Sequence, residues 1–165
     1  MLEALNKQVN AELYSAYLYL SMAAYFESIN LRGFANWMKI QAQEEVTHAM
    51  KFFEYINERG GRVKLESIEK PPIEWASPLE VFEATYEHEI NVTKMINNLV
   101  NLAIEEKDHA TYNMLQWFVA EQVEEEASAD EIRQQLKFIG EDGRGILMLD
   151  RELAKRIFTP PKEEK

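Results

Sequence analysis

The sequence contains no cysteine. Disulfide bonds, thiolate zinc sites and iron–sulfur clusters are therefore excluded, because each of them requires a cysteine sulfur. Glycine and proline are scarce as well, with 6 and 5 positions in 165 residues. Few points in the chain thus interrupt a helix, and long segments remain unbroken between them.

Basic residues are outnumbered: 18 lysines and arginines stand against 29 aspartates and glutamates, a net charge of −11 at pH 7 with histidine neutral. This balance disfavours a nucleic acid or an anionic membrane as the main partner, since both are negatively charged themselves. No run of ~18 uncharged apolar residues is present to span a bilayer, and the first seven residues lack the basic-then-apolar pattern of a secretory signal. We expect a soluble, cytoplasmic protein.

What the sequence does contain is apolar mass in a helical pattern. Hydrophobic residues make up 46% of the chain, and a chain of this length buries roughly 70% of the surface that it exposes when unfolded. Their spacings of three and four residues are typical of helices, and no segment shows the strict alternation of strands. We predict one domain over residues 1–165, with long helices at about 2–29, 33–59, 78–107 and 109–139, a short helix at about 145–157, and a tail at 158–165.

The connections between these helices predict how the helices pack. Turns of a few residues, around 30–32 and at Asp108, make each neighbouring pair an antiparallel hairpin. The link over 60–77 has 18 residues and reaches up to ~60 Å, whereas a helix of ~27 residues is ~40 Å long. The link can therefore cross from one end of a bundle to the other. The fold class is all-α: a four-helix bundle over about 2–139, made of two hairpins joined by a long crossover, plus the short C-terminal fifth helix.

Each long helix carries a carboxylate in the middle of an otherwise apolar stripe: Glu12, Glu45, Glu89 and Glu125. His48 follows Glu45 by three positions and Gln122 precedes Glu125 by three, so each of these pairs shares a helix face. Counted from the turns, all six side chains fall within ~10 Å of one another along the bundle axis. The four stripes are therefore interrupted at one level.

Four carboxylates inside a bundle cost several kcal/mol each and repel one another. No lysine or arginine falls on the four stripes to pair with them. Either the carboxylates are protonated, or the stripes are misassigned, or cations bind there. Two divalent ions would neutralise four carboxylates, with His48 and Gln122 as neutral ligands. Oxygen-rich ligation with one imidazole suits iron or manganese, with zinc as a competitor, and we interpret the pattern as a paired iron site.

The chain closely resembles prokaryotic (bacterial and archaeal) non-haem ferritins in five segments: 12–19 (ELYSAYLY), 33–38 (GFANWM), 44–49 (EEVTHA), 86–89 (YEHE) and 117–126 (WFVAEQVEEE). The resemblance implies a ferritin-like bundle and an iron-storage function. Such proteins are ferroxidases, which oxidise Fe(II) to Fe(III) with O₂ and thereby detoxify it. They deposit the ferric product as an oxide mineral inside a hollow homo-oligomeric shell, typically of 24 subunits.

By this resemblance, Glu12, Glu45 and His48 hold the first iron of the ferroxidase centre. Glu45 bridges to a second iron, which is held by Glu89 and Glu125 with Gln122 close by.

The resemblance also implies a third, more loosely held iron site, formed by Glu44, Glu121 and Glu124. Tyr19 matches the tyrosine beside the centre. Haem is not expected, because Val46 stands where the related bacterioferritins carry their haem-binding methionine.

Two other functions remain open at this point. The chain would also suit a di-iron oxygenase or peroxidase of the same superfamily that stores no mineral, or a metal-free scaffold bundle. A second apolar row on the first helix, formed by Leu13, Tyr17, Leu20 and Ala24, predicts a face that packs against another subunit. His88 and His109 lie off the stripes, and we expect both at the surface.

Overall fold

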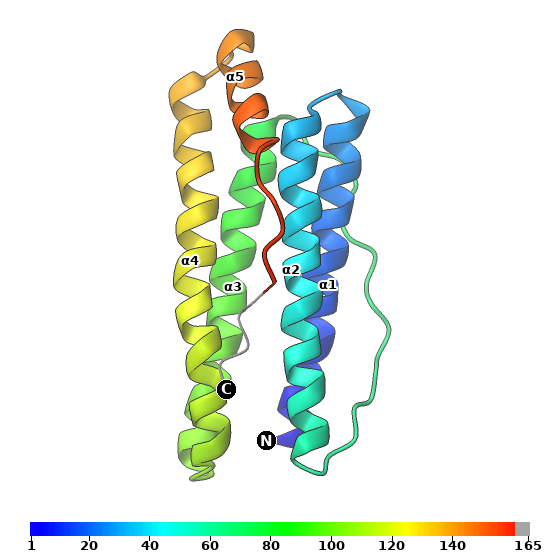
Figure 1. The fold of residues 1–165 in the computed structure, drawn as a ribbon, viewed down its shortest axis with the longest axis vertical. Coiled ribbons are helices and arrows are strands. Elements are labelled where there is room, and N and C mark those ends of the chain that lie inside the picture. The colour runs from blue at the N-terminus through cyan, green and yellow to red at the C-terminus, as the bar shows by residue number, and fades with distance from the viewer. Residues whose placement is uncertain (161–165) are drawn as a thin grey trace. The chain divides into compact units, whose positions relative to one another are not determined.

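The computed structural model describes residues 1–160, and within that range the chain forms helices and no strands. The helices are α1 (Leu2–Ser28), α2 (Arg32–Glu58), α3 (Pro78–Glu105), α4 (His109–Ile139) and α5 (Gly143–Leu153) (Figure 1). The predicted all-α class is confirmed, and the long helices end within two residues of their predicted bounds. The part of the expected tail at 161–165 lies outside the described residues. Among the helices described, none has the length and apolarity needed to span a bilayer.

The described residues group into two compact units. Met1–Leu5 and Ala76–Gly140 form one unit, in which α3 and α4 lie side by side as a hairpin. Asn6–Trp75 and residues 141–160 form the other, which contains most of α1 together with α2 and α5.

Local capping explains where the helices begin. The Ser77 hydroxyl accepts a hydrogen bond from the Glu80 backbone N–H at 3.2 Å, with Pro78 at the first helical position of α3. The Asp108 carboxylate accepts one from the Thr111 N–H at 3.2 Å and starts α4. Both starts agree with the sequence, because a cap contacts only residues three positions away.

The predicted bounds of the fifth helix, 145–157, were wrong. The Asp142 carboxylate accepts a hydrogen bond from the Arg144 N–H at 3.1 Å, so α5 begins at Gly143. It ends at Leu153. Beyond that residue the backbone turns toward α2, where the Asn36 amide donates hydrogen bonds to the carbonyls of Leu153 and Arg156.

The link between the hairpins runs along α1 (Figure 1). Near its start, the Lys64 N–H donates a hydrogen bond to the Asn6 side chain at 2.7 Å. Near its end, the Ser21 hydroxyl donates one to the Pro72 carbonyl, and the Trp75 ring meets the Tyr25 ring at 5.6 Å. The link thus follows α1 from Asn6 to Tyr25, which is ~28 Å at the rise of a helix, as expected of a crossover.

The apolar ends of the predicted stripes are buried. Phe26 and Phe34, on either side of the α1–α2 turn, are fully buried and stack at a centroid distance of 5.0 Å. In the other unit, Phe82 and Phe118 are buried on α3 and α4. By contrast, Tyr17 and Leu20 of the second row on α1 remain 50% and 51% exposed.

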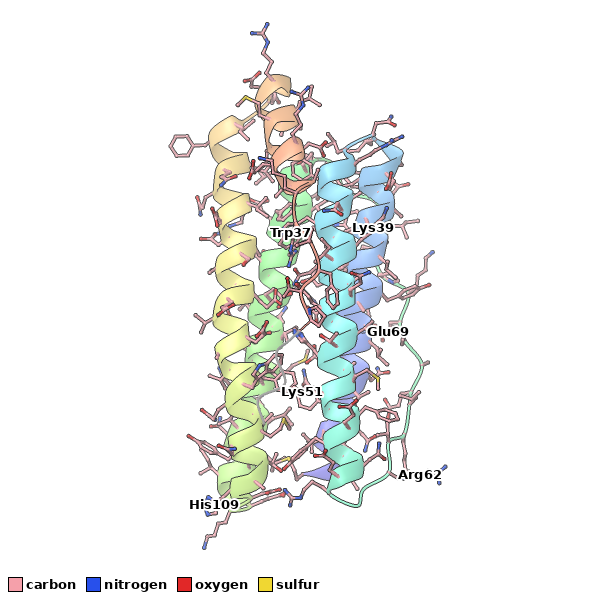
Figure 2. The ribbon with its side chains drawn as sticks, viewed as in Figure 1. Trp37, Lys39, Lys51, Arg62, Glu69 and His109 are labelled. Carbon is pink, nitrogen blue, oxygen red and sulfur yellow. The ribbon has the colours of Figure 1, made fainter. Side chains whose placement is uncertain are left out.

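The two histidines off the stripes behave differently. His109 is exposed at the start of α4, as expected (Figure 2). The expectation for His88 was wrong, because its side chain is half-buried on α3. Burial disfavours the charged imidazolium and lowers the pKa of His88 to about 4, from an ordinary value of 6.5.

This burial predicts a pH dependence of folding. Between pH 6.5 and 4 the unfolded chain takes up a proton on His88 and the native chain does not, so stability is full above pH 6.5 and falls as the pH is lowered. At pH 5 the loss is on the order of 1–2 kcal/mol. Urea unfolding of the metal-free protein should give a lower free energy of unfolding at pH 5 than at pH 7.5. In His88→Gln this difference should be smaller by the same amount. An unchanged difference in that variant would contradict the assignment.

The amino end of α2 receives its cap from a distant residue. Leu31 at the N-cap makes no side-chain hydrogen bond, and the Asp150 carboxylate of α5 accepts hydrogen bonds from the N–H groups of Gly33 and Phe34 at 2.8 and 3.0 Å. The approach is close: a Cβ atom at Gly33 would lie 1.6 Å from the Asp150 carbonyl oxygen. Glycine at 33 therefore lets α5 reach this helix end.

Removing this cap should destabilise the protein. We expect Asp150→Ala to lower the free energy of unfolding by about 1 kcal/mol, because two N–H groups at the helix start lose their acceptor. Asp150→Asn keeps an acceptor oxygen and should lose less. Urea denaturation provides the measurement, and equal stability of the alanine variant and the wild type would refute the role of Asp150.

Candidate metal centre

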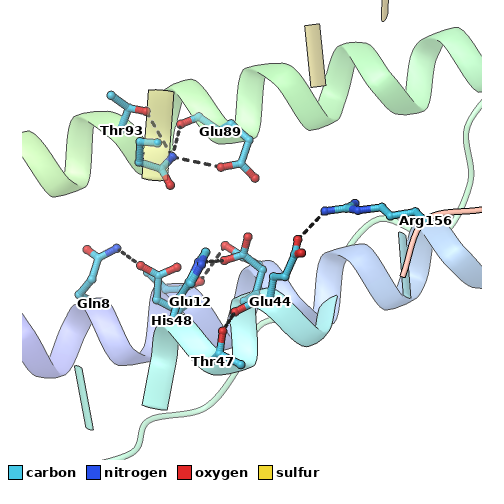
Figure 3. Close-up of polar contacts among 12 residues, drawn as sticks. Gln8, Glu12, Glu44, Thr47, His48, Glu89, Thr93 and Arg156 are labelled. Atoms are coloured by element: carbon cyan, nitrogen blue, oxygen red, sulfur yellow. Dashed lines mark hydrogen bonds and ion pairs between the residues drawn. The ribbon is translucent and has the colours of Figure 1, made fainter. Parts of the chain in front are cut away.

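The hairpin of α1 and α2 brings three of the predicted ligands together. Glu12 of α1 and Glu45 and His48 of α2 each offer a ligand atom, and these atoms lie within 4.8 Å of one another. The Nδ1 atom of His48 is 3.4 Å from a carboxylate oxygen of Glu45 (Figure 3). All three side chains are buried, with at most 3% of their surface exposed. The spacing of three between Glu45 and His48 places both on one helix face, as a turn of an α-helix requires.

One oxygen in this cluster lacks a partner. The Gln8 amide, one turn before Glu12, donates a hydrogen bond to Glu12 Oε1 at 2.8 Å (Figure 3). Glu12 Oε2 is buried and has no hydrogen-bond partner. A buried acceptor left unsatisfied costs about 1–3 kcal/mol, and more when it is charged. A cation bound among these three side chains would satisfy it, so the residues present fit a metal ion.

The hairpin of α3 and α4 holds a second set. Glu89 of α3 and Gln122 and Glu125 of α4 are buried. Gln122 Nε2 donates hydrogen bonds to the Glu89 carboxylate at 3.1 Å, to the Glu89 carbonyl at 3.2 Å and to the Thr93 hydroxyl at 3.2 Å. The amide nitrogen of Gln122 thus orients the Glu89 carboxylate, and its carbonyl oxygen is the atom that could ligate a metal. Glu125 lies one turn beyond Gln122 on the same face of α4.

The other predicted site residues differ in their exposure. Tyr19 is fully buried two turns after Glu12. Glu44 and Glu121 are half-buried, and Glu124 is exposed. The three residues assigned to a third iron by resemblance are therefore more exposed to solvent than the two buried sets.

One residue beside this centre, Arg156, was not among the predicted site residues. Arg156 follows α5, and its guanidinium lies 2.5 Å from Glu44 Oε2 (Figure 3). It also donates a hydrogen bond to Gln41 and sits over the ring of Trp37 (labelled in Figure 2). The one sequence signal for this contact is that positions 37, 41 and 44 share a face of α2. The sequence does not show that the chain returns to this face after α5.

A cavity of about 500 Å³ opens between α3 and α4 beside the second set. Gln122 and Thr93 line it together with the carboxylates of Glu126 and Asp130. The Thr93 hydroxyl donates a hydrogen bond to Glu126 at 2.5 Å. A small molecule could therefore reach Gln122 from this side.

The donor atoms of each set indicate which ions suit it. The first set consists of carboxylate oxygens and one imidazole nitrogen, the second of carboxylate oxygens and one amide oxygen, and neither contains sulfur. Such ligands suit iron, manganese and zinc.

The unpartnered oxygen of Glu12 predicts opposite effects on the metal-free and the metal-loaded protein. Glu12→Gln removes a buried charge next to Glu45, so we expect the melting temperature of the metal-free protein to rise by roughly 2–4 °C, about 1 kcal/mol. The same variant should lose most of the thermal stabilisation that Zn(II) gives the wild type. Thermal scans with and without Zn(II) measure both effects.

The matched control is Glu54→Gln, which neutralises an exposed carboxylate on α2. It should change neither the melting temperature nor the effect of zinc. A Glu12→Gln variant that keeps the full stabilisation by zinc would show that Glu12 holds no metal.

A family model described as "Ferritin-like domain" matches residues 2–139. A Bacteroides fragilis protein named "Bacterial non-heme ferritin" is 48% identical over 153 residues, which cover 93% of this chain and 95% of that protein. A Campylobacter jejuni protein of the same name is 42% identical over 162 residues, covering 98% and 97%. The crystal structure of an open pore ferritin from the archaeon Archaeoglobus fulgidus is 65% identical, with a TM-score of 0.95, covering 95% and 97%.

Proposed function

The chain belongs to the ferritin family and has its fold, and on that premise we propose that it stores iron by oxidising Fe(II) with O₂. The buried cluster of Glu12, Glu45 and His48, with its unpartnered carboxylate oxygen, is the observation that supports this function most strongly. Iron is here the substrate, and the stored ferric oxide is the product.

We propose further that the two compact units form one domain over residues 1–165 and that their buried sets complete one centre for two iron ions. Each of α1, α2, α3 and α4 carries one buried carboxylate midway along its length: Glu12, Glu45, Glu89 and Glu125. Together they have a charge of −4, which two Fe(II) ions neutralise. Without such ions, four buried carboxylates in one core would cost several kcal/mol each.

Each ligand has a distinct role in this proposal. Glu12 and His48 hold the first iron, Glu125 and Glu89 hold the second, and Glu45 bridges the two. Gln122 keeps the Glu89 carboxylate in place through its amide N–H group. Each Fe(II) gives one electron, and O₂ leaves as hydrogen peroxide after it has received two electrons and two protons. In this proposal Tyr19, which is buried two turns from Glu12, assists the electron transfer.

Storage requires a hollow assembly. We propose that Tyr17 and Leu20, half exposed on α1, are covered by a neighbouring subunit, and that the subunits form a shell of 24. The net charge of −11 attracts Fe(II), and acidic side chains offer sites where Fe(III) begins to hydrolyse into mineral. Glu44, Glu121 and Glu124 would hold a third iron on its way out of the centre. The cytoplasmic location, the absence of haem and the substitution of zinc or manganese for iron remain predictions.

The bridging role of Glu45 gives the direct test. Glu45→Ala should slow the fast oxidation of Fe(II) by at least about a hundredfold, because both ions lose a ligand. Stopped-flow absorbance after addition of two Fe(II) per subunit measures this rate, and the wild-type rate should saturate at that ratio.

Size-exclusion chromatography shows whether assembly survives, and we expect the variant to elute with the wild type at a mass of several hundred kilodaltons. Glu54→Ala, an exposed change on the same helix, should oxidise iron at the wild-type rate. Unchanged fast oxidation in Glu45→Ala would disprove the proposed centre.

The cavity beside Gln122 favours a second candidate, a di-iron oxygenase or peroxidase that acts on a small organic or peroxide substrate. On the α1–α2 side, the Tyr19 side chain is fully buried. A particle of small mass that retains no ferric mineral after iron loading would favour this candidate over storage.

A further inference from the structure

The segment that follows α5 is fastened to one face of α2. Asp150 caps the start of α2, and Asn36 donates hydrogen bonds to the carbonyls of Leu153 and Arg156 at 3.2 and 3.0 Å. We call residues 150–156 the C-terminal strap. Its last contact, made by Arg156, lies next to the candidate metal centre in the sequence of α2, because Glu44 directly precedes Glu45.

The surroundings of Arg156 fix its guanidinium in place. Nη1 donates hydrogen bonds to the Trp37 carbonyl at 3.2 Å and to Gln41 Oε1 at 3.0 Å, and Nη2 lies 2.5 Å from Glu44 Oε2. The guanidinium carbon sits 4.5 Å from the centre of the Trp37 ring, a cation–π contact. The side chains of Arg156 and Glu44 are 24% and 22% exposed, so solvent screens this pair only in part.

Glu44 therefore differs from the buried carboxylates on the same hairpin. Glu12 is supported by the neutral amide of Gln8 and keeps one oxygen without a partner, whereas Glu44 already has a cation on Oε2. A metal ion that binds Glu44 must displace this guanidinium or bind beside its positive charge. Both alternatives weaken the binding of a divalent cation.

We propose that Arg156 competes with iron for Glu44 and thereby keeps the third iron site weak and exchangeable. This inference rests on the proposed function, since it concerns iron that leaves the two-iron centre. Occupation of Glu44 by iron releases Arg156 and loosens the C-terminal strap, and return of Arg156 to Glu44 favours departure of the ion. The strap thus couples the third site to the packing of α5 on α2.

Binding of Zn(II), which needs no oxidant, tests the competition. Arg156→Gln removes the charge and keeps an amide that can hydrogen-bond to Gln41. In isothermal titration calorimetry it should bind the third Zn(II) per subunit about tenfold more tightly than the wild type. The first two ions should bind with unchanged affinity. Arg156→Lys keeps the charge and should stay within about threefold of the wild type at every site.

A double variant separates competition from a structural effect of the strap. In Glu44→Gln the third ion should bind weakly, and adding Arg156→Gln should no longer tighten it. Hydrogen exchange gives a readout independent of metal affinity. The third equivalent of zinc should speed exchange at backbone amides 153–157 in the wild type, and in Arg156→Gln exchange there should already be fast without zinc.

An unchanged or weaker third site in Arg156→Gln would overturn the proposal and leave Arg156 as an anchor of the strap alone. Equal tightening in Arg156→Gln and Arg156→Lys would overturn it too, because charge would then not be the cause. Failure of the wild type to bind two tight ions would instead refute the proposed function, and with it this inference.

Discussion

Burial of carboxylates along the middle of the helices is the constraint on which the rest of this structure depends. Apolar side chains could fill the positions of Glu12, Glu45, Glu89 and Glu125 at much lower energetic cost, since each buried carboxylate loses its hydration. The apolar ends of the same stripes, with their large aromatic side chains, provide the stability that makes this cost tolerable. The carboxylates are therefore best explained by the chemistry of cations.

The groups that support these carboxylates have a common property. Gln8 beside Glu12 and Gln122 beside Glu89 are amides, which hold a carboxylate oxygen in place without neutralising its charge. A lysine or arginine in their place would stabilise the metal-free protein and would also block the cation site. Amide support thus keeps the negative charge available for a metal ion.

The carboxylate of Glu44 on α2, which directly precedes Glu45, is supported by a cation and not by an amide. Its carboxylate is neutralised by Arg156, and both side chains are partly exposed, so less burial has to be compensated there. Neighbouring positions 44 and 45 thus point to different faces of α2 and have different electrostatic surroundings. The second face depends on the strap after α5, whose Asp150 also completes the amino end of α2.

The sequence by itself determined most of what depends on contacts a few residues apart, although the prediction missed the Asp142 cap that starts α5. The caps Ser77 and Asp108 act within three positions, and the stripe that buries Glu45 with His48 follows from the period of the helix. Only the tertiary structure decided three other features: the contacts of Asp150 and Arg156 with α2, the end of α5 and the burial of His88. The contacts with α2 join positions more than a hundred residues apart. No local pattern encodes such contacts, because they depend on where the chain returns and on which neighbour covers a side chain off the main stripe.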